Sequence, residues 1–154
     1  MRINCTGLCM SDVHLMANDW GFPPMATMGT KCPGHEGAGV VVATGENVND
    51  WKVGDRAGIK AIWDTCGTCE LCQNDLENYC SGCKMAGYFV DGPRIFFRTL
   101  SRRTWTNESR IGTCKQYIRS AAKYTTRIPE GVEDAVAAPI LCSAMTSKPP
   151  SFSP

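Results

Sequence analysis

The chain lacks a long apolar segment and lacks an excess of either charge. Its longest apolar run, at 37–43, is far shorter than the roughly 20 residues of a membrane-spanning helix. No apolar core of a secretory signal peptide stands near its start. Sixteen Lys and Arg against 15 Asp and Glu give a net charge of +1, which provides no general attraction to nucleic acid or lipid headgroups. These absences predict a cytoplasmic protein with no membrane or nucleic-acid partner.

Helical periodicity is scarce, and no G-x-G-x-x-G motif occurs, so a Rossmann domain for a dinucleotide is not expected within this chain. Short helices are expected only at 11–17 and at 132–138, the second one ended by Pro139. Short runs with strand character, separated by Gly and Pro, lie at 37–44, 53–63, 84–90, 114–118 and 124–128. The pattern predicts a mainly β, barrel-like fold with few short helices.

Cysteine, in contrast, is abundant. Ten cysteines without a secretory signal favour metal binding in a reducing compartment over a disulfide framework. Four of them follow the spacing C-x2-C-x2-C-x7-C, at Cys66, Cys69, Cys72 and Cys80. Thiolates this close in sequence repel one another unless a cation shares their charge, and Zn²⁺ with four thiolates is a closed structural site.

Two alternatives exist for this cysteine loop. An iron–sulfur cluster also uses C-x2-C-x2-C, but such runs end in C-x3-C-P, whereas Cys80 comes eight positions after Cys72 and is followed by Ser81. Four ordinary buried thiols rarely show two consecutive C-x2-C steps with a fourth cysteine nearby. Zinc is therefore the favoured ligand.

Three further motifs are weak when each is taken alone, because a single Cys or His is more often a core residue than a metal ligand. They are Gly7-Leu8-Cys9-Met10-Ser11-Asp12, Gly34-His35-Glu36-Gly37 and Pro139-Ile140-Leu141-Cys142. In this order, and with the cysteine loop, they resemble the catalytic domain of the zinc-dependent medium-chain alcohol dehydrogenases, especially the yeast-like branch. The resemblance covers about 3–92 and 113–146 and is strongest in 34–42, 45–48 and 58–60.

The resemblance implies a GroES-like, partly open barrel with a zinc-binding loop. It implies a catalytic zinc held by Cys9, His35 and Cys142, with Glu36 beside the metal as an alternate ligand. Asp12 would orient a ligand, through the imidazole of His35.

The resemblance also implies a reaction. A small alcohol would lose hydride to NAD or NADP and become an aldehyde or ketone. Ser11 and His14 occupy the positions that pass the alcohol's proton to solvent, and Trp20 occupies a wall of the substrate pocket. Members of the family oligomerise mainly through their cofactor domain.

The chain also departs from the family pattern, whose members are about twice as long because a Rossmann domain follows. We expect a GroES-like domain at 1–146 that is incomplete at its N-terminus, a basic insertion at 93–112, and a disordered tail at 147–154. A retained intron or an isoform-specific segment would each account for 93–112. Such a chain is expected to be inactive alone, without its cofactor domain.

Two other functions compete with this hypothesis. A zinc-stabilised module could bind nucleic acid or another polyanion through the five arginines of 93–112, or the chain could be a non-functional fragment. Four acids and no Lys or Arg lie between residues 64 and 83, so the zinc loop itself would repel phosphate. The charge of the loop therefore argues against the nucleic-acid module.

Overall fold

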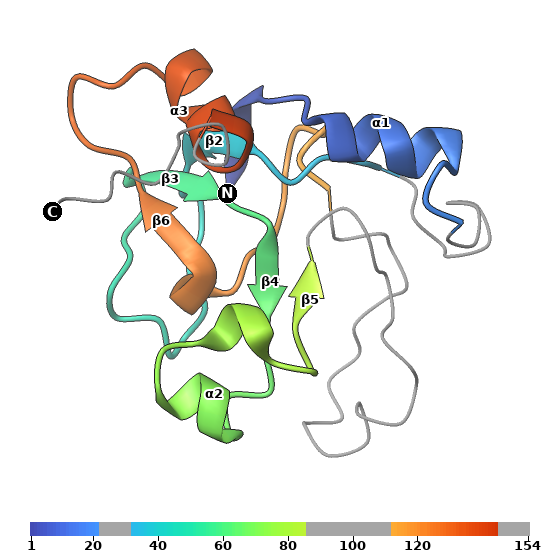
Figure 1. The fold of residues 1–154 in the computed structure, drawn as a ribbon. Helices are drawn as coiled ribbons and strands as arrows, with labels where there is room; N and C mark the ends of the chain where they lie inside the picture. Colours follow the sequence, from blue (N-terminus) through green and yellow to red (C-terminus); the bar gives the residue numbers. More distant parts are fainter. Residues whose placement is uncertain (22–31, 86–111, 145–154) are drawn as a thin grey trace, which may run out of the picture.

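Four antiparallel strands form the main sheet of the computed structural model, which describes residues 1–21, 32–85 and 112–144 (Figure 1). Their order across the sheet is β1 (Arg2–Thr6), β2 (Gly37–Val40), β3 (Arg56–Ile59) and β6 (Thr125–Arg127). Side chains along β1 alternate between exposed and half-buried, as expected when one face of a strand packs on a core. The sheet is open, since it runs from β1 at one edge to β6 at the other.

A second, two-stranded sheet pairs β4 (Ile62–Asp64) with β5 (Lys84–Met85). Between these strands the chain forms α2 (Glu70–Gln73) and the 3-10 turn η1 (Glu77–Tyr79), at the bottom of Figure 1. The other helical elements are α1 (Met10–Ala17), η2 (Ala122–Tyr124) and α3 (Asp134–Ile140). In the ranges that the structure describes, no helix has the length and apolarity needed to cross a membrane.

Small side chains build the core between the sheet and α3. Ala38 of β2 is fully buried and packs with Ile128, Ala137 and Ala138, with Cys5 at the margin. Because alanine projects so little, α3 lies close on β1 and β2. This close contact fixes the end of α3, from which one candidate metal ligand follows.

The predicted fold class is confirmed: the chain is mostly sheet, with few short helices and an unclosed sheet. Several boundaries differ from expectation. The run at 53–63 divides into β3 and β4. The run at 114–118 forms no strand of its own, but it lies along β1 through the Arg2–Tyr117 bridge and a hydrogen bond from the Ile3 amide to the Gln116 carbonyl at 2.8 Å. β1 was not predicted. Residues 86–111 and 145–154, which hold most of the basic insertion and the whole tail, lie outside the described residues.

The expectation that Pro139 ends its helix is wrong. Pro139 lies inside the last turn of α3, where its ring removes a single amide donor. The chain continues through a tighter turn, in which the amide of Leu141 donates to the Ala138 carbonyl at 3.2 Å. The helix therefore extends far enough to bring Cys142 to the sheet.

Gly39 gives a test of the sheet. A methyl group at Gly39 would overlap the Arg2 carbonyl on the facing strand β1, whereas one at Gly45 would meet only Val48 at 3.7 Å. We expect Gly39→Ala to lower the free energy of unfolding by about 1–3 kcal/mol, the usual cost of overpacking. Gly45→Ala, the matched control, should change it little. Urea denaturation of both variants checks this, and equal midpoints would contradict the β1–β2 register.

Candidate metal centres

The cysteine loop folds so that its four sulfur atoms form a tight group. Cys66 Sγ lies 3.8 Å from Cys72 Sγ and 3.5 Å from Cys80 Sγ, and Cys69 Sγ lies 3.8 Å from Cys80 Sγ. Four thiolates at the usual Zn–S distance of about 2.3 Å define a tetrahedron with edges of about 3.8 Å. The sulfur positions thus fit a tetrahedral zinc ion.

Hydrogen bonds favour negative charge on this group. The amide of Cys69 donates to Cys66 Sγ at 3.4 Å, and the amide of Gly82 donates to Cys80 Sγ at 3.3 Å. Backbone amides, including that of Thr68, lower the pKa of Cys66 to about 6. The Cys72 amide also favours a thiolate at Cys69, but the surrounding sulfurs outweigh it and raise the pKa of Cys69 to about 11. A cation that shares their charge would favour thiolates at Cys66 and Cys69 together.

A second group of metal donors comes from three distant parts of the chain. Cys9 immediately precedes α1, His35 and Glu36 immediately precede β2, and Cys142 follows α3. One donor atom from each of these four residues lies within 4.8 Å of the others, and His35 Nε2 lies 3.2 Å from Cys142 Sγ. Two sulfurs, an imidazole nitrogen and a carboxylate are a donor set that suits zinc.

Asp12 connects the segments that carry Cys9 and His35. Its side chain is 0 % exposed, and its carboxylate accepts the amides of Cys9 and Gly34, each at 3.1 Å. The same carboxylate lies 3.1 Å from His35 Nδ1, which therefore carries the proton and leaves the Nε2 lone pair to face a metal. Burial lowers the pKa of His35, but Asp12 and Cys9 outweigh it and place that pKa above its usual value.

The two carboxylate oxygens of Glu36 have different surroundings. Its Oε1 accepts the amide of Ser143 at 2.6 Å, whereas Oε2 is buried and has no hydrogen-bond partner among the described residues. Gly7 makes room for this oxygen, because a methyl group there would overlap Oε2. A buried carboxylate oxygen without a partner is costly, and a metal ion beside it would remove that cost.

The two cysteines of this group differ in their readiness to ionise. Burial opposes a thiolate at Cys9, but hydrogen bonds with Ser11 and the proximity of His35 outweigh it, so the pKa of Cys9 is lowered. Burial, then the charges of Cys9 and Glu36, raise the pKa of Cys142 to about 12. A divalent cation would stabilise both thiolates at once.

The remaining predicted residues lie along α1 and just beyond it. Ser11 contacts Cys9 through the hydrogen bonds that lower the pKa of that thiol. His14 and Trp20 stack on each other with ring centroids 5.3 Å apart, and His14 Nδ1 lies 2.8 Å from Asp19 Oδ2. The left-handed residue Asn18 ends the helix and turns Asp19 and Trp20 back toward His14.

Three residues contribute to these sites in ways that sequence reasoning did not indicate: Gly7, which stands in the first motif without an assigned role, Ser143 and Asp19. Ser143 acts through its backbone amide, which any residue except proline would supply, and Gly7 contributes only space. Neither contribution depends on a side chain, so neither can be recognised from the amino-acid sequence. Asp19 could have been found, because an acid five positions after a helical histidine can reach it once the helix ends.

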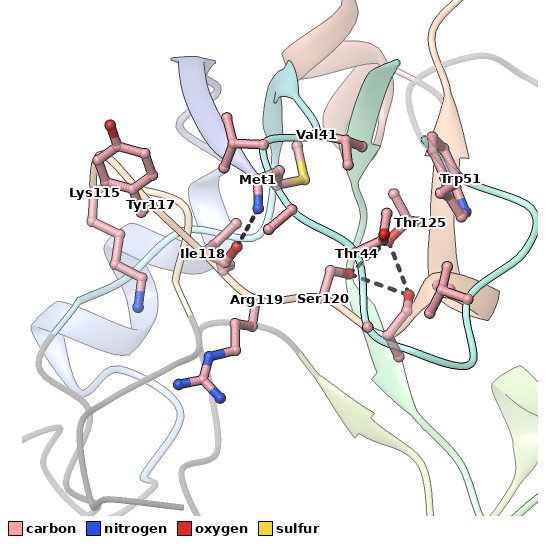
Figure 2. A pocket seen from close by; sticks show the side chains of 16 residues that line it. Met1, Val41, Thr44, Trp51, Lys115, Tyr117, Ile118, Arg119, Ser120 and Thr125 are labelled. Atoms are coloured by element: carbon pink, nitrogen blue, oxygen red, sulfur yellow. Dashed lines mark hydrogen bonds between the residues drawn. The ribbon is translucent and has the colours of Figure 1, made fainter. Parts of the chain in front are cut away.

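A pocket of about 760 Å³ opens elsewhere, between the 41–51 loop and the 115–125 segment (Figure 2). At its base the amino group of Met1 donates to the Ile118 carbonyl at 2.7 Å. None of the candidate metal ligands lines this pocket. It is therefore separate from both metal centres.

Comparison with known proteins agrees with this geometry. Residues 1–130 match the family model described as the alcohol dehydrogenase GroES-like domain. The chain is 36% identical over 147 residues to alcohol dehydrogenase 1 of Emericella nidulans, and 37% identical over 147 residues to the alcohol dehydrogenase of Schizosaccharomyces pombe. Each match covers 95% of this chain and 35% of the relative, so the chain spans about a third of these relatives.

Solved structures show the same likeness. A cinnamyl alcohol dehydrogenase from Sorghum bicolor superposes with a TM-score of 0.76 at 29% identity, over 94% of this chain and 37% of that one. An enzyme titled CAD from Helicobacter pylori, in complex with NADP(H), gives a TM-score of 0.74 at 26% identity, over 94% of this chain and 38% of that one.

The cysteine loop predicts one zinc ion that the fold requires. Cys69→Ser should lose this ion and unfold the loop, since zinc in such sites contributes on the order of 10 kcal/mol of folding free energy. Elemental analysis and thermal unfolding measure both effects. Cys5→Ser, which alters a half-buried cysteine outside both groups, is the control. Unchanged zinc content in Cys69→Ser, or iron with visible absorbance in the wild type, would refute the zinc assignment.

The contacts of Asp12 predict that its substitution weakens metal binding at the second centre and leaves the cysteine loop unchanged. In Asp12→Asn the side chain loses its charge and one of its two acceptor oxygens, so the ring of His35 is held less firmly. Loss of such a partner lowers metal affinity about 10–100-fold. Competition with a chromophoric zinc chelator measures the affinity, and the exposed Asp75→Asn controls for the change in charge. An unchanged affinity would show that Asp12 does not position His35.

Proposed function

The chain belongs to the alcohol dehydrogenase family through its GroES-like domain, and we propose that it is the zinc-binding catalytic domain of such an enzyme. The observation that carries this proposal is the second metal centre. Donor atoms of Cys9, His35, Glu36 and Cys142 meet within 4.8 Å although they come from opposite ends of the sequence. These donor atoms come together only when the sheet is folded and α3 is packed on it.

We propose that Cys9, His35 and Cys142 hold the catalytic zinc and that Glu36 is an alternate ligand. Zinc bound by two thiolates and an imidazole supplies a Lewis acid that lowers the pKa of an alcohol hydroxyl. Asp12 keeps the His35 ring oriented for this task by accepting the proton of Nδ1. The four thiols of the cysteine loop would hold a second zinc that stabilises the fold.

The proposed path for the proton runs along α1. Ser11, which is hydrogen-bonded to Cys9, would accept the hydroxyl proton of the alcohol, and His14 would pass it on. His14 lies one turn further along the same face of the helix and is exposed to solvent on one side. Asp19 holds the imidazole of His14, and Trp20 covers its face and would form a wall of the substrate pocket.

The hydride acceptor would be NAD or NADP, and the substrate a small alcohol or aldehyde. The 154 residues contain no glycine-rich dinucleotide motif, so we assign no cofactor-binding residue. We propose that residues 1–146 form the catalytic domain and that the protein is cytoplasmic. In the family, oligomers form mainly through the cofactor domain, and the same is proposed for the full-length protein.

A nucleic-acid-binding role finds less support. The zinc loop in the structure carries Asp64, Glu70, Asp75 and Glu77 and no basic residue between 64 and 83. Such a surface repels phosphate. The arginines that the alternative requires fall almost entirely outside the described residues.

A chimera tests the proposed function. This chain, with 93–112 deleted, replaces the matching segment of the Schizosaccharomyces pombe alcohol dehydrogenase. The chimera should oxidise a primary alcohol with NAD⁺, and Cys9→Ser should abolish the activity. The isolated chain should show none, because hydride transfer requires a nicotinamide held at near-attack distance.

Cys5→Ser in the same chimera is the matched control and should stay active, since Cys5 lies on β1 outside both donor groups. The zinc content from elemental analysis should fall from two ions per chain to one in Cys9→Ser, while an unchanged thermal unfolding midpoint of the cysteine loop would show that the structural ion is retained. A chimera whose activity survives Cys9→Ser, or an isolated chain that reduces NAD⁺ in a Cys9-dependent way, would refute the proposal.

A further inference from the structure

A fifth cysteine stands beside the four-sulfur group and has no part in the proposed function. Cys83 follows Cys80 at the spacing C-x2-C, the same spacing that joins Cys66 to Cys69 and Cys69 to Cys72. Its side chain is half-buried. The segment at 66–83 thus contains five thiols, whereas a tetrahedral zinc ion accepts four.

The turn at Cys80–Cys83 has the backbone form of a metal-binding cysteine pair. The amide of Cys83 donates to the Cys80 carbonyl at 2.9 Å, and the amide of Gly82 donates to Cys80 Sγ at 3.3 Å. At the start of the loop the amide of Cys69 likewise donates to Cys66 Sγ, at 3.4 Å. There, both cysteines of the pair belong to the four-sulfur group. The turn at 80–83 is built similarly, yet of its two cysteines only Cys80 belongs to the four-sulfur group.

The turn that carries Cys83 packs on the four-sulfur group through Gly82. A methyl group at Gly82 would lie 3.3 Å from Cys66 Cβ and 3.6 Å from Cys80 Sγ, so the turn packs directly on the cluster. Burial raises the pKa of Cys83, and the charges of Cys80, Cys72 and Asp64 raise it further. The charges of the four-sulfur group thus reach the Cys83 thiol, which stands in the turn beside the group but is not one of its four sulfurs.

We propose that Cys83 is a spare ligand of the structural zinc and exchanges with Cys80 for the fourth position. In the exchange the Zn–Sγ bond of Cys80 breaks as that of Cys83 forms, and the proton of the Cys83 thiol passes to the Cys80 thiolate. The metal keeps four thiolates and no electron moves. This inference rests on the zinc proposed for the cysteine loop and is independent of the dehydrogenase reaction.

Alkylation of the zinc-loaded wild-type protein tests the exchange without a variant. N-ethylmaleimide should place one label per chain in this loop, divided between Cys80 and Cys83, because labelling either thiol fixes the other on the metal. Cys66 and Cys69 should stay protected, as peptide mass spectrometry would show. A label on Cys83 alone, with Cys80 as protected as Cys69, would overturn the proposal.

Three variants extend the test, with zinc content as the readout. Cys80→Ser should keep its structural zinc, because Cys83 takes the vacated position. The double variant Cys80→Ser/Cys83→Ser should lose the ion, as should Cys69→Ser with Cys83 intact. Loss of zinc from Cys80→Ser to the same extent as from Cys69→Ser would refute the exchange. Absence of structural zinc from the wild type would refute the zinc assignment itself, which is a distinguishable outcome.

Discussion

One buried carboxylate, that of Asp12, is the constraint on which the second metal centre depends. It accepts the amides of Cys9 and Gly34 and the Nδ1 proton of His35, all at 3.1 Å. A fully buried charge costs several kcal/mol unless it is paired, so these donors must stay in place together. Asp12 thereby ties the start of α1 to the segment that leads into β2. Removing any of the three donors would leave the carboxylate without part of its compensation.

Glu36 likewise ties the end of α3 to the second metal centre. Its Oε1 is satisfied by the amide of Ser143, which holds the end of α3 near the sheet, and Leu141 packs on Gly58 of β3 beside it. Its Oε2 is buried without a partner among the described residues. The protein thus fixes the carboxylate through one oxygen and leaves the other oriented for a cation. With Cys142 held as a neutral thiol by burial and by neighbouring charge, the site gains most from a divalent ion.

Sequence reasoning found the ligand residues more readily than the elements that carry them. Metal chemistry restricts ligands to a few residue types at set spacings, so the four cysteines of 66–80 are recognisable from the amino-acid pattern alone. The pair His35-Glu36 is not, and only the family resemblance indicates a ligand role for it. Strand boundaries depend on partners distant in sequence, and for that reason β1 was missed and the run at 114–118 was assigned wrongly. Pro139 misled for a local reason, since a proline in a last helical turn costs only one hydrogen bond. Ser143 acts through its backbone and leaves no signal in a sequence.

The two centres also differ in how they assemble. The four sulfurs of the loop come from within 15 consecutive positions and are arranged by local turns and α2. Their arrangement therefore needs few contacts between distant parts of the chain. The donors of the second centre span residues 9 to 142, and closing a loop of that length carries an entropic cost that the sheet and α3 must first offset. The cysteine loop brings its four sulfurs together through local turns and α2 alone. The second centre forms only once Asp12, Glu36 and α3 are all in place, which makes it depend on the completeness of the fold.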